Sequence, residues 1–189
     1  MTNKDNTATP QIALRQYKES DLPDVHRYFS DPEVVRFLRG EPMTEDEALA
    51  FLKQSIAYAS DQPQHRFPFA IVLSQTDRVV GGCILSITSP EHREARIAYH
   101  IGREHWGRGY ATEAVTQLLG WAFATQNLHR IAAACRPENA ASVRVLSKVG
   151  MTLEGCLREE RWKDGRWWDS LCYAILDREW EPASASAEE

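Results

Sequence analysis

The sequence predicts one mixed α/β domain, of the α+β kind, in which helices pack on a mostly antiparallel twisted sheet. Two observations predict this class. Three strand-like runs, at 66–74, 78–89 and 93–102, are joined by short polar turns, which is typical of an antiparallel meander. The chain then alternates a helical run, a buried strand and a second helical run before it closes with a hairpin. A length of 189 residues with 43% apolar residues suits a single domain with a sizeable core.

The elements before the meander are one strand and two helices. Residues 11–18 alternate between apolar and polar side chains, which predicts a strand. A helix follows from Ser20 or Asp21 as N-cap, with a proline in its first turn. The second helix starts at Thr44, because Thr44 and Glu47 have the spacing of a capping box before a helical apolar stripe.

The elements after the meander are predicted from apolar spacing and from turn residues. Apolar residues recur at helical spacing over 111–122, a buried strand spans 129–136, and a short helix runs from Asn139 as N-cap to Val149, with Gly150 ending it. Two strands flank a turn at 163–165, and we expect the aromatic residues there to serve packing rather than a substrate slot. The domain is expected to span 11–180, with flexible termini at 1–10 and 181–189.

Composition excludes several classes of protein. The net charge of −5 argues against a nucleic-acid face, and neither a membrane span nor a secretory signal is readable, so we expect a cytoplasmic location. The histidines and cysteines lack metal-ligand spacing, and we predict no metal. The four widely spaced cysteines are expected to be buried thiols: Cys83, Cys135, Cys156 and Cys172.

The segment His105–Ala114, HWGRGYATEA, places two glycines directly before a helix. The unpaired N–H groups at a helix N-terminus bind phosphate, and Gly107 and Gly109 would permit positive φ and close approach of an anion. Arg108 adds a positive charge at the mouth. Because no Gly-Lys-Ser/Thr follows and Thr112 replaces a third glycine, neither a P-loop nor a dinucleotide fingerprint fits.

This loop and the later stretch PENAASVRVLSKVGM, Pro137–Met151, together resemble the GNAT superfamily of acyl-CoA-dependent N-acyltransferases. The family reads Gln/Arg-x-x-Gly-x-Gly/Ala in the loop and Asn-x-x-Ala/Ser at the later helix. Here these are Trp106–Ala111 and Asn139–Ser142. The resemblance covers about residues 11–180, and the form Trp-Gly-x-Gly-Tyr-Ala-Thr-Glu-Ala resembles the branch of ribosomal-protein N-terminal acetyltransferases.

The resemblance implies a fold and a cofactor site. The fold is a GNAT-like sheet of about seven strands flanked by about four helices and splayed between the fourth and fifth main strands. The co-substrate is acetyl-CoA, without a metal. The residues expected beside it are Tyr99, His100, Ile101, Trp106, Gly107, Arg108, Gly109, Tyr110, Ala111, Thr112, Asn139 and Ser142.

The resemblance also implies direct attack of a neutral amine on the thioester, with no acyl-enzyme. Leu146 stands where many members have the tyrosine that protonates the CoA thiolate, so Ser142 is the expected acid, as in the similar branch. Arg96 replaces a carboxylate often proposed as base. Glu94 and His100 on the same strand face are candidate bases, and two acids near the last hairpin, Glu159 and Glu160, remain alternatives.

The expected activity is acetylation of a protein or peptide α-amine, because an amine with a pKa of about 7.7 to 8.0 tolerates a weak base. Two alternatives stay open: acetylation of a small amine such as an antibiotic, an amino acid or a polyamine, and a non-catalytic acyl-CoA-binding regulator. The expected partner is the amine acceptor, with no nucleic acid and no membrane. A homodimer is compatible with the resemblance, although no segment marks an interface.

Overall fold

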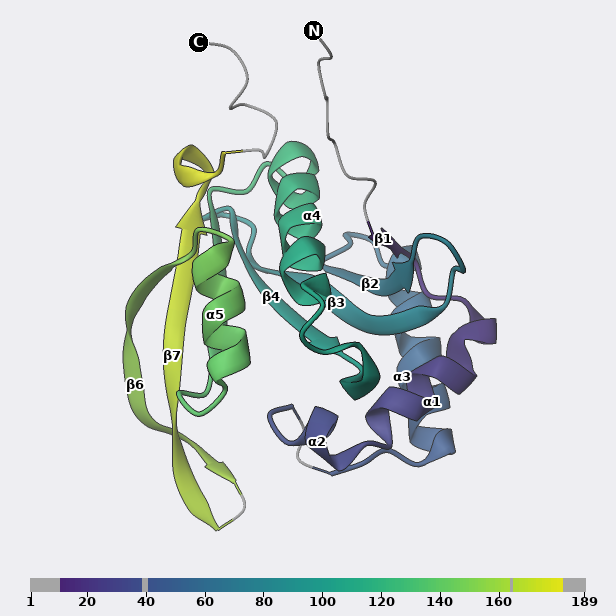
Figure 1. The fold of residues 1–189 in the computed structure, drawn as a ribbon. Helices are drawn as coiled ribbons and strands as arrows, with labels where there is room; N and C mark the ends of the chain where they lie inside the picture. Colours follow the sequence, from purple (N-terminus) through teal and green to yellow (C-terminus); the bar gives the residue numbers. More distant parts are fainter. Residues whose placement is uncertain (1–10, 39–40, 164, 182–189) are drawn as a thin grey trace, which may run out of the picture.

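The computed structural model describes residues 11–38, 41–163 and 165–181. A seven-stranded sheet has the order β1-β2-β3-β4-β5-β7-β6, and every neighbouring pair is antiparallel except β4 and β5 (Figure 1). The strands are β1 Ile12–Arg15, β2 Arg66–Leu73, β3 Val79–Ser89, β4 Glu94–Ile101, β5 Arg130–Cys135, β6 Thr152–Lys163 and β7 Arg166–Leu176. The mixed class and the mostly antiparallel sheet are confirmed.

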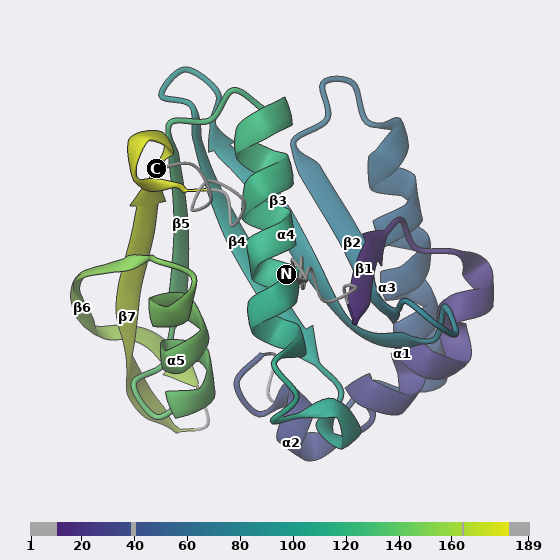
Figure 2. The same ribbon diagram turned by 45° about the horizontal axis from the view of Figure 1, so that its top comes forward.

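Helices cover both faces of this sheet (Figures 1 and 2). They are α1 Leu22–Phe29, α2 Pro32–Val35, α3 Glu45–Ala57, α4 Tyr110–Thr125 and α5 Ala140–Lys148. One buried cluster joins α4 to the sheet through residues such as Leu118 and Ile71, and a second joins α1 and α3 to it through residues such as Leu52 and Ala70. Ile71 and Ala70 are adjacent in β2 and point to opposite faces, so the two helical layers lie on opposite sides.

Local signals place most of the helix ends where the sequence predicts them. The Thr44–Glu47 capping box is present, and the Asn139 side chain accepts a hydrogen bond from the Ser142 amide at 3.1 Å. Gly150 follows α5 with φ +85°. Asp21 is the N-cap of α1, but its carboxylate binds the Arg15 guanidinium at 2.8 Å instead of capping the helix. The short helix α2 was not predicted, because four residues carry no periodicity.

The splay between β4 and β5 is the feature that positions the site. The two parallel strands pair only from Glu94 to Arg96 with Arg130 to Ala132. Beyond these pairs β5 stays with β7 as far as Cys135, while β4 continues to Ile101 beside β3. The β4 edge from Ile97 to Ile101 is therefore open toward β5, as the resemblance to the GNAT superfamily implied.

Three expectations concern features outside the site. The flexible termini are predicted at 1–10 and 181–189; of these, residues 1–10 and 182–189 lie outside the described residues, as does Asp164 in the hairpin turn. Cys83 is buried and Cys135 and Cys172 are half-buried, but Cys156 is exposed, because β6 is an edge strand with little packed on either face; the expectation of a buried thiol is wrong there. No helix in the described ranges is long and apolar enough to cross a membrane.

Candidate active site

Two pockets meet at the open end of β4, and the residues Tyr99 and His100 line both. The first, which we call the cofactor cleft, has a volume of about 530 Å³ and lies at the N-termini of α4 and α5. The second, which we call the acceptor pocket, has a volume of about 870 Å³ and lies between α3 and strands β2, β3 and β4. Because the two share residues at one end, molecules held in each would meet there.

The glycine loop of the cofactor cleft has the predicted conformation. Gly107 and Gly109 have φ of +76° and +83°, and a Cβ built on either would meet no heavy atom within 4 Å. The positive φ explains why glycine is required at both positions, since residues that carry a Cβ atom disfavour positive φ. The exposed Trp106 donates its indole N–H to the Ile101 carbonyl at 2.7 Å, which ties the loop to the end of β4.

The main-chain N–H groups of this loop are unpaired. Across the described ranges, none of the amides from Gly107 to Thr112 donates a hydrogen bond, and the first one used is that of Glu113, to the Gly109 carbonyl at 3.1 Å. Unpaired amides at the start of a sixteen-residue helix form an anion site with a partial positive charge. The loop therefore fits the diphosphate of an acyl-CoA.

The structure brings together nearly all of the residues predicted for the cofactor. All but Arg108 line the cofactor cleft: Tyr99, His100, Ile101, Trp106, Gly107, Gly109, Tyr110, Ala111, Thr112, Asn139 and Ser142. Arg108 is exposed and does not line the cleft. The carbonyl of Ile101 is already bonded to Trp106, so it is not a free acceptor for pantetheine.

Two cations and one segment of this cleft were not predicted from the sequence. Arg144 and Lys148 line it from the exposed face of α5, four residues apart on one helix face, and that spacing was readable. The segment from Glu33 to Leu38, which includes part of α2, closes the opposite side. Its place could not be predicted locally, because about sixty residues of sequence separate it from the β4 residues that line the same cleft.

Ser142 and Tyr99 form a hydrogen-bonded pair between the cofactor cleft and the open strand edge. Their hydroxyl oxygens are 2.8 Å apart. Burial raises the pKa of Tyr99 above its ordinary value, and the bond from Ser142 opposes the shift. Both hydroxyls stay protonated at neutral pH, so the pair can donate a proton or relay one. The sequence assigned Tyr99 to cofactor contact and did not predict this bond.

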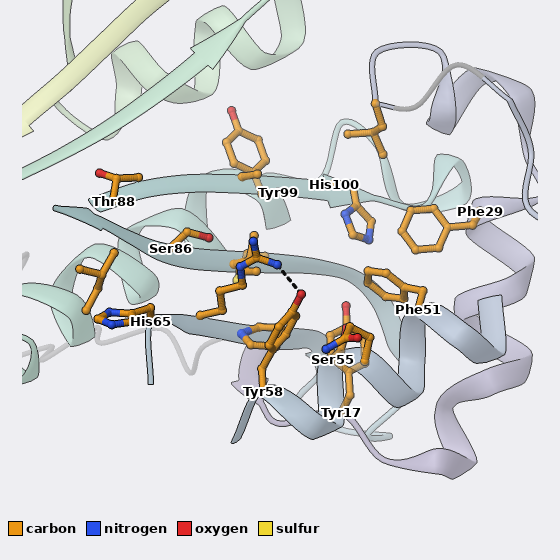
Figure 3. Close-up of a pocket in the computed structure, with 18 of the residues that line it drawn as sticks. Tyr17, Phe29, Phe51, Ser55, Tyr58, His65, Ser86, Thr88, Tyr99 and His100 are labelled. Carbon is orange, nitrogen blue, oxygen red and sulfur yellow. Dashed lines mark hydrogen bonds between the residues drawn. The ribbon is translucent and has the colours of Figure 1, made fainter. Parts of the chain in front are cut away.

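His100 points to the other face of the sheet, into an aromatic environment (Figure 3). Its ring centroid lies 4.9 Å from that of Tyr28 and 4.8 Å from that of Phe29. Burial lowers the pKa of His100 to about 4, so the imidazole is neutral at physiological pH. A neutral imidazole whose conjugate acid is this strong is a weak base toward an ammonium group.

The three candidate carboxylates lie away from both pockets. Glu94 starts β4 at the paired end, where its carboxylate lies 3.8 Å from the Arg130 guanidinium, six residues and about 20 Å of strand from His100. The Glu159 amide and the Glu160 carboxylate bond to neighbours on β7, Asp169 and Ser170 respectively. None of the three lines either pocket, and this placement does not favour a role as base.

The acceptor pocket has walls that are mainly apolar and aromatic, and no Asp or Glu is among its described lining residues. Tyr17, Phe29 and Phe51 gather with His100 at one end, while His65 and Thr88 lie at the other (Figure 3). Arg66 is the one arginine in its described lining. The sequence did not predict this pocket, because its walls come from segments between residues 17 and 100 that meet only in the folded chain.

The aromatic cluster of the last hairpin does not line either pocket. Trp168 and Tyr173 are buried, as expected for packing, whereas Trp162 and Trp167 are exposed and contact each other at a centroid distance of 5.3 Å. Within the described ranges, no three His, Cys, Asp or Glu side chains are grouped to hold a metal ion.

Comparison with known proteins agrees with this geometry. Residues 11–152 match the family model described as Acetyltransferase (GNAT) domain. The chain is 34% identical to an uncharacterized N-acetyltransferase, p20, of Bacillus licheniformis, over 91% of this chain and 96% of the relative.

Two solved structures are similar over nearly the whole chain. The spermidine N-acetyltransferase from Vibrio cholerae, solved with CoA and spermine, has 26% identity and a TM-score of 0.77 over 90% of this chain and 98% of the other. The ribosomal-protein-S5-alanine acetyltransferase from Vibrio fischeri has 26% identity and a TM-score of 0.77 over 92% and 97%. The chain therefore belongs to the GNAT family and is an N-acetyltransferase that uses acetyl-CoA.

Proposed function

We propose that this enzyme acetylates the α-amine of a peptide or protein. The neutral amine nitrogen attacks the thioester carbonyl carbon of acetyl-CoA, the C–S bond breaks, the nitrogen loses a proton and the CoA thiolate gains one. No acyl-enzyme is formed, so none of the four cysteines is needed as a nucleophile.

The observation that carries this proposal is the chemistry of the acceptor pocket. Its described walls are apolar and hold no carboxylate, and Arg66 contributes a positive charge. A polyamine is a multiple cation, and burying its charges without paired carboxylates would cost free energy. An α-amine at the end of a peptide brings one charge, which it sheds before it reacts.

The weakness of the available base supports the same class of acceptor. His100 is the one imidazole in the described lining that both pockets share, and burial lowers its pKa to about 4. An α-amine is roughly a tenth neutral at pH 7, whereas a lysine amine is neutral in roughly 1 molecule in 2,500. The enzyme can therefore select the neutral α-amine from solution without a strong base.

We assign the proton donor to Ser142, with Tyr99 as its hydrogen-bonded partner. Ser142 lines the cofactor cleft at the N-terminus of α5, and Tyr99 reaches it from the open edge of β4. The amides of Gly107–Thr112 would hold the diphosphate of acetyl-CoA. Arg144 and Lys148 on the rim would pair with its further phosphate charge.

The relatives include both classes of acceptor. One solved relative is a spermidine N-acetyltransferase, and another is a ribosomal-protein-S5-alanine acetyltransferase. The acceptor pocket of this chain favours the second class, and so does the resemblance of its loop to the branch that acts on ribosomal-protein N-termini.

A release assay for free CoA thiol tests the proposal. The acceptor panel contains peptides with a free α-amine, the same peptides with an acetylated N-terminus and a lysine side chain, and spermidine. We expect release with the first group, and much slower release with the other two. Release with spermidine alone would assign the enzyme to small cationic amines. Binding of acetyl-CoA without release for any acceptor would contradict catalysis on this panel.

A further inference from the structure

A row of charged and polar residues crosses three strands at one end of the acceptor pocket, where Arg66 and Ser86 line the pocket and Arg96 lies beside it. Arg66 of β2 is opposite Ser86 of β3, and Ser86 is opposite Arg96 of β4. Directly opposed residues of antiparallel strands point to the same face, with Cβ atoms about 5 Å apart. The two arginines therefore flank Ser86 on one face, with Cβ atoms about 10 Å apart.

This row lies at a defined distance from the reacting end. Arg96, Ala98 and His100 alternate along β4, so they share one face of the sheet; Ala98 and His100 line the acceptor pocket, and Arg96 lies next to it on that face. Four residues of strand separate Arg96 from His100, which is about 13 Å. The row between the two ends, Pro68, Ile84 and Ala98, is apolar.

Neither arginine is neutralised by an acid. Among the residues that the structure describes, no carboxylate lies within ion-pair distance of Arg66 or Arg96. The Arg66 guanidinium donates to the Tyr58 hydroxyl and lies 5.1 Å from the centroid of its ring, which holds it over the pocket wall. Arg96 is exposed, and the adjacent acid on its face, Glu94, is paired with Arg130.

We propose that the acceptor carries a carboxylate about 13 Å from its reactive amine, and that Arg66 and Arg96 bind it. An extended peptide spans about 3.3 to 3.6 Å per residue, so the carboxylate belongs to the third or fourth residue. This inference rests on the proposed peptide α-amine acceptor and adds a charge requirement to it. The carboxylate is either an acidic side chain or the C-terminus of a short peptide.

Two sets of peptides test the charge and its source. The first set is tetrapeptide amides that differ only in the fourth residue, which is Glu, Gln or Lys. The second set is one neutral tripeptide with a free or an amidated C-terminus. We expect kcat/KM for Glu to exceed that for Gln by about fivefold and for Lys to fall below Gln, since an exposed ion pair is worth up to about a factor of five. A preference in the second set alone would assign the C-terminus as the source.

Arginine variants test the location. In R66Q and R96Q the ratio of kcat/KM for the Glu peptide to that for the Gln peptide should shrink, and in the double variant it should fall to about one. Arg178→Gln, an exposed arginine of the last turn that lines neither pocket, is the matched control and should keep the preference. About 0.5 M salt should weaken the preference in wild type.

The outcomes separate this inference from the function on which it rests. Equal kcat/KM for Glu, Gln and Lys peptides, with CoA released from all three, would overturn the charge requirement and leave α-amine acetylation intact. Retention of the Glu preference in the double variant would overturn the assignment to Arg66 and Arg96. Absence of release from every peptide would instead remove the proposed function.

Discussion

The cofactor cleft and the acceptor pocket share Tyr99 and His100 but are built from different chemical groups. The cleft presents main-chain amides at helix N-termini with cations at its rim, whereas the pocket presents side chains of aromatic and aliphatic residues. Main-chain donors bind any diphosphate in the same way, so the cleft suits a common co-substrate. Side chains set shape and charge, so we propose that the pocket determines specificity for the acceptor. Variants on each side should therefore affect one substrate and spare the other.

The largest effect is expected where the two regions meet, at Ser142, the proposed proton donor. Ser142→Ala should lower kcat by about 100-fold or more, because a positioned acid contributes about 10²- to 10⁴-fold. The dissociation constant of acetyl-CoA should change by less than about threefold, because the variant loses at most one neutral hydrogen bond to the cofactor. Single-turnover kinetics and calorimetry measure the two quantities. Ser147→Ala, at an exposed serine of the same helix, is the control. A larger loss of affinity than of rate would make Ser142 an anchor.

The next effect concerns the main-chain site alone. Gly109→Val should weaken acetyl-CoA binding by about 10- to 100-fold, because a β-branched residue at φ +83° costs about 1 to 3 kcal/mol and shifts the loop. Binding is measured by calorimetry. Gly165→Val, at φ +73° and outside both pockets, imposes the same backbone strain and should leave binding unchanged. Equal binding by a folded Gly109→Val protein would contradict the assignment of the loop.

A smaller effect is expected in the acceptor pocket. Phe51→Leu should raise KM for a peptide by about five- to tenfold, since the lost apolar contact is worth about 1 to 1.5 kcal/mol. The acetyl-CoA dissociation constant should not change. Phe123→Leu, which alters a partly buried phenylalanine on α4 beside Trp180, tests whether general loosening gives the same result. A matching change in cofactor affinity would show that the two regions are not separable.

The rim cation of the cofactor cleft should give an effect of a few-fold. Lys148→Gln should weaken acetyl-CoA binding by about threefold at low salt and less at high salt, because an exposed charge pair is screened. Lys53→Gln, an exposed lysine on α3 that lines neither pocket, is the matched control. A salt dependence identical in both variants would remove Lys148 from the phosphate site.

The smallest effect is expected in the pH dependence of kcat/KM, to which the titratable groups of the protein should contribute little. With its pKa lowered to about 4, His100 is neutral throughout pH 6 to 9 and adds no titration there. For a peptide acceptor, kcat/KM should rise with pH and level off near the pKa of its own α-amine, about 7.7 to 8.0. Acceptors with different amine pKa values should shift the profile accordingly. A profile fixed near 6.5 for all acceptors would indicate a histidine base.

The two regions also differ in how far they could be predicted. The glycine loop, the Asn139 cap and the helices after them are contiguous in sequence, and their conformations follow from local rules on φ, capping and helix ends. The acceptor pocket brings together residues from Tyr17, which follows β1, to His100 on β4. These residues lie up to about eighty positions apart in the sequence. The alternation of apolar and polar side chains predicts which residues of a strand share a face. It does not predict which residues of the neighbouring strand lie opposite them.

The sequence by itself determined the α/β class, the splayed sheet, the glycine loop before α4 and the position of Ser142, because each rests on residues that act through their own backbone or on motifs of a few residues. Only the tertiary structure decided which groups surround the acceptor. In the folded chain Glu94 forms an ion pair with Arg130, His100 is buried among aromatic rings and Tyr99 is hydrogen-bonded to Ser142. Strand register and burial fix these contacts, and both are properties of the whole sheet.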